Sequence, residues 1–153
     1  MLEEEAFYRR LAVEAQQLEL EEPTFHSVKG DVTAWRGVIL GTGIYDNGVF
    51  YIDIELKRTY PFEPPRVLFK TPIWHPNIGL DGRVCVGILG KDWRPGINLV
   101  GVIETIRNLL NFPNPKDPLN RVAAEQMMLK PSEFEKTVRE YVSKYATWNQ
   151  KIS

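Results

Sequence analysis

The sequence predicts an α+β fold with an N-terminal helix, a four-stranded antiparallel meander and C-terminal helices. Three observations carry this prediction: apolar residues recur at helical spacing near the N-terminus, a period of two dominates from 24 to 70, and helical spacing returns after residue 98. A chain of 153 residues is long enough to bury most of the surface that it exposes when unfolded. We interpret 1–153 as a single domain, with 147–153 as a flexible tail.

The first helix is predicted over residues 3–20. Phe7, Leu11 and Leu18 recur at helical spacing and define one apolar face. Pro23 ends the helix, because its ring cannot continue one. The predicted helix is therefore amphipathic and packs one face on the core.

Four segments rich in β-branched and aromatic residues follow, separated by turn sequences. Their short connections favour antiparallel pairing. In the third segment, Phe50, Ile52 and Ile54 alternate with polar residues, which predicts one apolar face for helices to cover. The predicted strands are Thr24–Lys29, Ala34–Leu40, Val49–Leu56 and Arg66–Lys70.

Three helices are predicted after residue 98. Leu99–Leu110 is apolar around much of its surface, as expected of a buried helix, and Asn98 is a suitable N-cap. Leu119–Leu129 forms the next helix. A capping box at Ser132–Glu135 opens the last one.

Composition excludes several classes of function. With 19 basic and 20 acidic residues, nothing indicates general affinity for nucleic acid or for an acidic membrane. The single cysteine excludes an internal disulfide. The chain has only two histidines, His26 and His75, and they lie far apart in the sequence, so no metal site is predicted. We find neither a signal peptide nor an apolar run of about 20 residues. These features together predict a cytoplasmic protein.

An irregular segment from 71 to 98 contains the only cysteine, Cys85, and long loops in compact domains are usually functional. Pro76 restricts the backbone before Asn77, and Asp81-Gly82 predicts a reversal midway to the cysteine. The thiol and the carboxamide can therefore become neighbours. Taken singly, a lone cysteine is usually a small buried apolar residue, and an asparagine after proline usually fixes a turn.

Three motifs in this order resemble the ubiquitin-conjugating enzyme (E2) family. They are Tyr60–Pro65 (YPFEPP), His75–Asn77 (HPN) with Cys85 eight positions after the asparagine, and Pro113–Leu119 (PNPKDPL). The resemblance covers roughly residues 5 to 146 and identifies the chain as a divergent member. It implies the family's UBC-like fold.

The resemblance implies a transferase that accepts ubiquitin or a ubiquitin-like modifier from an activating enzyme (E1) as a thioester on Cys85. The modifier would then pass to lysine of a protein substrate, usually with a RING-type E3 ligase. A thiol needs no dedicated base for the first exchange, because a few per cent is thiolate at neutral pH and is very nucleophilic. The chain would be a monomer and would hold no cofactor, since the E1 uses the ATP.

Two more residues are candidates for catalysis. The Asn77 amide could stabilise the oxyanion of the tetrahedral intermediate, or it could only brace the loop. The family motif places an acid at Asp117, which could orient the attacking lysine and lower the pKa of its amine. Alternatively, Asp117-Pro118 could cap a helix. We expect His75 and Pro76 to be structural.

Further residues are assigned to partner binding by the resemblance. Arg9 and Arg10 lie on the first helix, where the family docks the E1, and a solvated charged face is the alternative. The predicted E3 surface consists of Pro61, Phe62, Trp93 and Pro95.

The sequence departs from the family pattern at two positions near the cysteine. Gly87 stands where many members have an acid, and so does Phe112, directly before the PNP motif. These departures leave open whether the thioester would react readily with lysine.

Two rival functions also remain. A non-catalytic E2-like scaffold that only binds modifier is disfavoured by the presence of Cys85. A cysteine hydrolase would require His75 to swing from a proline-stiffened segment onto the thiol, with no residue to orient it.

Overall fold

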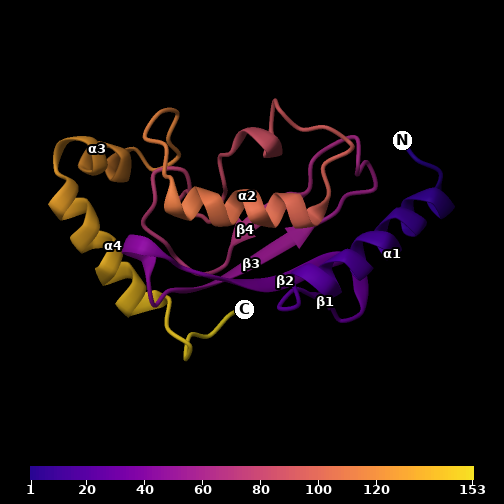
Figure 1. Cartoon of the computed structure of the whole chain (residues 1–153), viewed down its shortest axis with the longest axis horizontal. Helices are drawn as coiled ribbons and strands as arrows, with labels where there is room; N and C mark the ends of the chain where they lie inside the picture. Colours follow the sequence, from indigo (N-terminus) through magenta and orange to yellow (C-terminus); the bar gives the residue numbers. More distant parts are fainter.

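The computed structural model describes residues 1–153 as one sheet with helices on one of its faces and at its two ends (Figure 1). The elements, in chain order, are α1 (Glu4–Glu21), β1 (His26–Val28), β2 (Asp31–Leu40), η1 (Gly43–Tyr45), β3 (Val49–Glu55), β4 (Arg66–Phe69), η2 (Gly87–Leu89), α2 (Leu99–Asn111), α3 (Arg121–Leu129) and α4 (Pro131–Tyr145). The η elements are single 3₁₀ turns.

The sheet is the predicted antiparallel meander, in the order β1-β2-β3-β4. Strand β2 begins three residues earlier than predicted. Lys29 and Gly30 both have positive φ angles (53° and 74°), and this allows a tight two-residue reversal between β1 and β2. The alternation in β3 is confirmed, because Phe50, Ile52 and Ile54 are buried.

Helix α2 crosses the apolar face of the sheet, with α1 at one end and α3 and α4 at the other (Figure 1). Val102, Ile103 and Ile106 of α2 are fully buried and belong to the same core cluster as the apolar residues of β3. Asn98 is the predicted N-cap, since its side-chain oxygen accepts the N–H of Gly101 at 2.8 Å. The core therefore lies between α2 and the sheet.

The start of α3 corrects the sequence analysis. The helix begins at Arg121 rather than Leu119, and Asn120 caps it by accepting the Ala123 N–H at 3.0 Å. The N–H groups of Leu119 and Asn120 instead donate to the Pro76 carbonyl, at 2.9 and 3.0 Å. Asp117 is therefore not a helix cap.

The predicted capping box of the last helix is also wrong. Helix α4 begins at Pro131, a residue suited to the first helical position because the N–H that it lacks would have no helical partner. Lys130 is the N-cap and makes no side-chain capping bond. Ser132 lies inside the first turn.

The last residues, predicted to be a flexible tail, make defined contacts with the sheet. The side-chain oxygen of Gln150 accepts from the Thr71 hydroxyl at 2.5 Å, and its amide N–H donates to the Val49 carbonyl at 2.8 Å. Arg36 donates to the Ser153 carbonyl at 2.9 Å. Because Arg36 also pairs with Asp53, across from it on the polar side of the sheet, the tail follows the face opposite α2.

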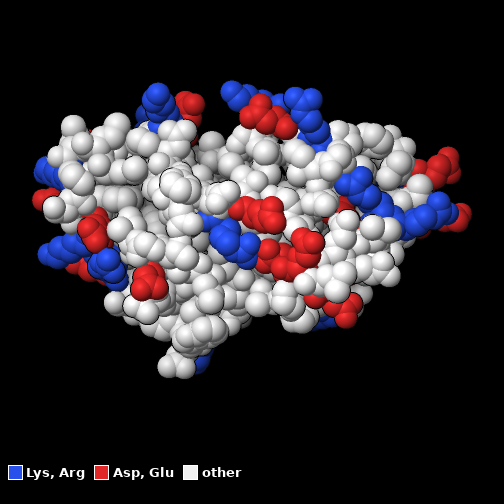
Figure 2. Space-filling view, in the orientation of Figure 1, with Lys and Arg blue, Asp and Glu red and all other residues white.

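Acidic and basic side chains are interspersed over the face shown in Figure 2, without one large region of a single sign. The view agrees with the near balance of 19 basic and 20 acidic residues. No helix combines the length and the apolar character that crossing a membrane requires.

Candidate active site

The segment around Cys85 forms the reversal expected from the sequence. The Cys85 N–H donates to the Asn77 carbonyl at 2.8 Å, and the Gly79 N–H donates to the Arg83 carbonyl at 2.8 Å. Gly82 at the turn has φ of 89°, and a Cβ there would collide with the Phe69 carbonyl, so only glycine fits. The hairpin leaves the Cys85 side chain exposed, so this lone thiol is not a buried apolar residue.

Asn77 is 3% exposed and joins two loops. Its amide nitrogen donates to the Asn114 carbonyl at 2.7 Å, and its oxygen accepts the Asn114 N–H at 2.8 Å. These paired bonds fasten the loop of the cysteine to the 113–118 loop. A primary amide has two N–H groups, so Asn77 keeps one for another acceptor.

His75 is fully buried and uses both ring nitrogens within the fold. Nε2 lies 2.8 Å from the Leu109 carbonyl, so Nε2 carries the proton and Nδ1 accepts the Asn77 N–H at 3.0 Å. Burial lowers the pKa of His75 to about 4, although the Leu109 carbonyl opposes that shift. The ring is therefore neutral at physiological pH and holds the Asn77 backbone in place.

Cys85 opens onto a pocket of about 380 Å³ between the 85–91 segment and the 113–118 loop. The three residues predicted to be catalytic, Cys85, Asn77 and Asp117, all line it. Asp117 is exposed and has φ of 51°, a conformation that aspartate tolerates better than most residues. Lys91 and Lys116 also line the pocket. Nowhere in the chain do three His, Cys, Asp or Glu side chains gather closely enough to hold a metal ion.

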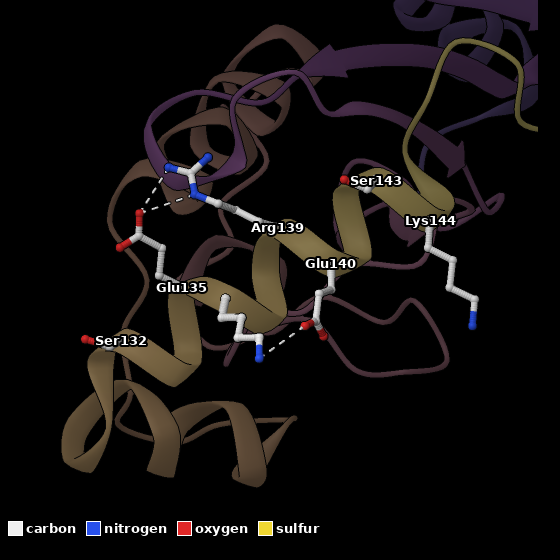
Figure 3. A pocket seen from close by; sticks show the side chains of 7 residues that line it. Ser132, Glu135, Arg139, Glu140, Ser143 and Lys144 are labelled. Atoms are coloured by element: carbon white, nitrogen blue, oxygen red, sulfur yellow. Dashed lines mark hydrogen bonds and ion pairs between the residues drawn. The ribbon is translucent and has the colours of Figure 1, made fainter.

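A larger hollow of about 770 Å³ runs along the exposed face of α4, but its residues offer no comparable chemistry. Glu135 pairs with Arg139 at 3.0 Å, and Lys136 approaches Glu140 at 4.0 Å, all projecting from one helix (Figure 3). The lining contains no cysteine or histidine. The smaller pocket at Cys85 is therefore the candidate active site.

The two arginines predicted to dock the E1 have different environments. Arg9 is exposed and pairs only with Glu5, one turn earlier, at 2.7 Å. Arg10 is partly buried, and its guanidinium binds Glu14 at 3.0 Å and the Pro95 carbonyl at 2.9 Å. Arg9 is therefore free to meet a partner, whereas Arg10 already has bonds within the fold.

Glu14 is a buried residue that the sequence analysis missed. Its carboxylate is 2% exposed and accepts from Arg10, from the Tyr60 hydroxyl and, at 2.6 Å, from the Leu99 N–H. It thereby joins α1 to the loop at residue 60 and to the start of α2. One signal could have revealed it. Glu14 is three residues after Leu11 and four before Leu18, so this acid lies on the apolar face of the predicted helix.

The predicted E3 surface consists of two adjacent loops. The Trp93 ring N–H donates to the Pro61 carbonyl at 2.8 Å, and the Trp93 and Tyr60 rings lie 6.0 Å apart. Pro61 is buried, whereas Phe62 is 51% exposed and Pro95 is also exposed. The loops are therefore fixed to each other, and Phe62 is an exposed aromatic residue on a supported loop.

The fold is that of an E2 domain. It matches a solved structure, the E2 domain of a Toxoplasma gondii ubiquitin conjugating enzyme, with a TM-score of 0.82 and 31% sequence identity, over 89% of this chain and 98% of that chain. Residues 10–142 also match the family model described as Ubiquitin-conjugating enzyme. The chain therefore belongs to the ubiquitin-conjugating enzyme family, as its three motifs predicted.

Proposed function

We propose that this protein is an active E2, which carries ubiquitin or a ubiquitin-like modifier as a thioester on Cys85 and transfers it to lysine. One observation carries the proposal: the only thiol of the chain is exposed in a pocket that also contains an amide donor and a carboxylate. We further propose a cytoplasmic monomer with no cofactor of its own, served by an E1 that uses ATP and by a RING-type E3.

In the first step, the Cys85 thiolate attacks the thioester carbonyl of the charged E1. A new C–S bond forms, the old one breaks, and the E1 thiolate leaves. One thioester replaces another, so the exchange is close to isoenergetic. It requires no base from this chain, which agrees with a His75 that is neutral and bound at both nitrogens.

In the second step, a lysine amine attacks the thioester, and the tetrahedral intermediate bears an oxyanion. The Asn77 N–H that has no partner can donate to this oxygen, and loss of such a donor costs about 10²- to 10³-fold in rate in other enzymes. Asp117 lines the same pocket, and its carboxylate makes no ion pair or hydrogen bond within the chain. It can orient the amine and accept its proton.

The geometry disfavours both rival functions. A hydrolase needs a base at the thiol, but both nitrogens of His75 bind other groups. A scaffold that only binds modifier has no need for an exposed cysteine in a polar pocket.

A charging assay tests the proposal. With E1, ATP and modifier, the wild type should form an adduct that a thiol reductant removes, and Cys85→Ala should form none. Cys85→Ser should form an oxyester more slowly, and thiol reductants should leave it intact. A thiol-sensitive adduct on Cys85→Ala would refute the assignment, and steady turnover of a small ester would favour the hydrolase.

A further inference from the structure

Two aspartates differ from all the others in this chain. Of the six, four use their carboxylates in hydrogen bonds or ion pairs: Asp31, Asp46, Asp53 and Asp81. The remaining two, Asp92 and Asp117, make neither. Asp117 lines the Cys85 pocket, and Asp92 adjoins it through Gly87.

The carboxylate of Asp92 lies directly against Gly87. A Cβ added to Gly87 would overlap Oδ2 of Asp92 and would lie 3.3 Å from its Cγ. The backbone of Gly87 does not adopt a positive φ, so chain conformation does not require glycine there. The Asp92 N–H also donates to the Gly87 carbonyl at 3.0 Å, which holds the turn closed. The carboxylate therefore occupies the space of the side chain that residue 87 lacks.

We propose that Asp92 is a second carboxylate of the acceptor site, and that with Asp117 it binds the lysine amine that attacks the thioester. This inference rests on the proposed function. Asp117 belongs to the 113–118 loop of the pocket, whereas Asp92 directly follows the 85–91 segment and lies against Gly87, which lines the pocket. Lys91 and Lys116 of the pocket pair with neither acid, which leaves both carboxylates available.

The lysine nitrogen loses two protons as the ammonium ion becomes an amide. Lysine arrives as an ammonium ion, which a carboxylate binds through a charge-assisted hydrogen bond. One proton passes by way of a carboxylate to solvent, and the free amine forms the C–N bond. The C–S bond then breaks, and the second proton ends on the Cys85 thiolate. Asp92 supplies binding and proton acceptance and forms no covalent bond.

A single-turnover discharge assay tests the proposal. The chain is charged, the E1 is stopped, and free lysine or hydroxylamine is added, with self-acylated chain counted separately by mass spectrometry. Asp92→Asn should slow lysine discharge about tenfold, the size of one charge-assisted hydrogen bond. Discharge to hydroxylamine, which is uncharged at neutral pH, should not change. Asp46→Asn, a change of the same type far from the pocket in sequence, should behave as wild type.

A second variant moves the carboxylate. Gly87→Asp combined with Asp92→Ala should recover lysine discharge to within about threefold of wild type, because the Cβ at 87 would then have only the Asp92 Cβ nearby, at 3.7 Å.

The outcomes separate the two proposals. Asp92 has no acceptor role if Asp92→Asn discharges to lysine as fast as Asp46→Asn does, or if its discharge to lysine and to hydroxylamine slows equally. In either case the thioester proposal stands. If the wild type never charges, the proposed function fails, and the role of Asp92 fails with it.

Discussion

Acid should destabilise this protein through His75. The pKa of the ring is about 4 in the fold, against an ordinary value of 6.5. Between these pH values the unfolded chain binds a proton that the folded chain does not. The contribution of neutral His75 to the free energy of unfolding is therefore fully present above pH 6.5 and is lost as the pH falls toward 4. The difference corresponds to about 3 kcal/mol of unfolding free energy at pH 4, and to about 2 kcal/mol at pH 5.

Urea unfolding followed by tryptophan fluorescence between pH 7.5 and pH 5 measures this loss. The variant is His75→Gln, and the control is His26→Gln, because His26 is the only other histidine and is exposed. The control should lose as much stability as the wild type over this range. His75→Gln should be less stable at pH 7.5, since it loses the bonds of the ring, but its stability should depend far less on pH.

The same experiment can refute the reasoning. If His75→Gln and wild type lose equal free energy between pH 7.5 and pH 5, other groups carry the acid sensitivity and His75 is not held neutral. The consequence for the site is direct, because a proton on Nδ1 removes the acceptor for the Asn77 N–H. Acid should therefore loosen the cysteine loop before the whole domain unfolds.

Four other variants test the catalytic site and the partner surfaces. Asn77→Ala should slow lysine discharge about 10²-fold and charging much less, and should cost about 2 kcal/mol of stability through its two bonds to the 113–118 loop. Raising the pH should rescue discharge by Asp117→Ala but not by Asn77→Ala, and full rescue of the latter would refute its oxyanion role. Arg9→Glu should slow charging at limiting E1 and leave lysine discharge unchanged, and an unchanged charging rate would restore the solvated-face interpretation. Phe62→Ala should weaken stimulation by a RING-type E3 by about 2 kcal/mol or more while charging stays normal, and equal stimulation of both proteins would show that the E3 binds elsewhere.

Most of the fold could be predicted because its signals are local. The alternation in β3, the helical spacing of α1 and α2, and the Asn98 cap each depend on residues within a few positions of one another. The hairpin that pairs residues 77 and 85 was predictable from one turn sequence between them. The motifs supplied the family, and the structural match agrees with it.

The start of α3, Glu14 and Asp92 could not be predicted from local patterns, because each depends on a contact that forms only in the folded chain. The start of α3 moved because Leu119 and Asn120 are bound to the distant Pro76 carbonyl, and Asn120 has an extended backbone and caps the helix instead of joining it. Glu14 was missed because its partners lie at residues 60 and 99. Asp92 was missed because only the folded turn brings its carboxylate over Gly87. Local propensity contains no information on such contacts.

The buried carboxylate of Glu14 has a consequence for how this protein can diverge. It is a common attachment point for the first helix, the loop before Phe62 and the start of α2. A substitution that shifts one of these segments must move the others or leave a buried charge without its partners, at a large cost in stability. The surfaces proposed for the E1 and for the E3 are therefore constrained to evolve together, and exchanging one of them between relatives should succeed only when the residues around Glu14 are exchanged with it.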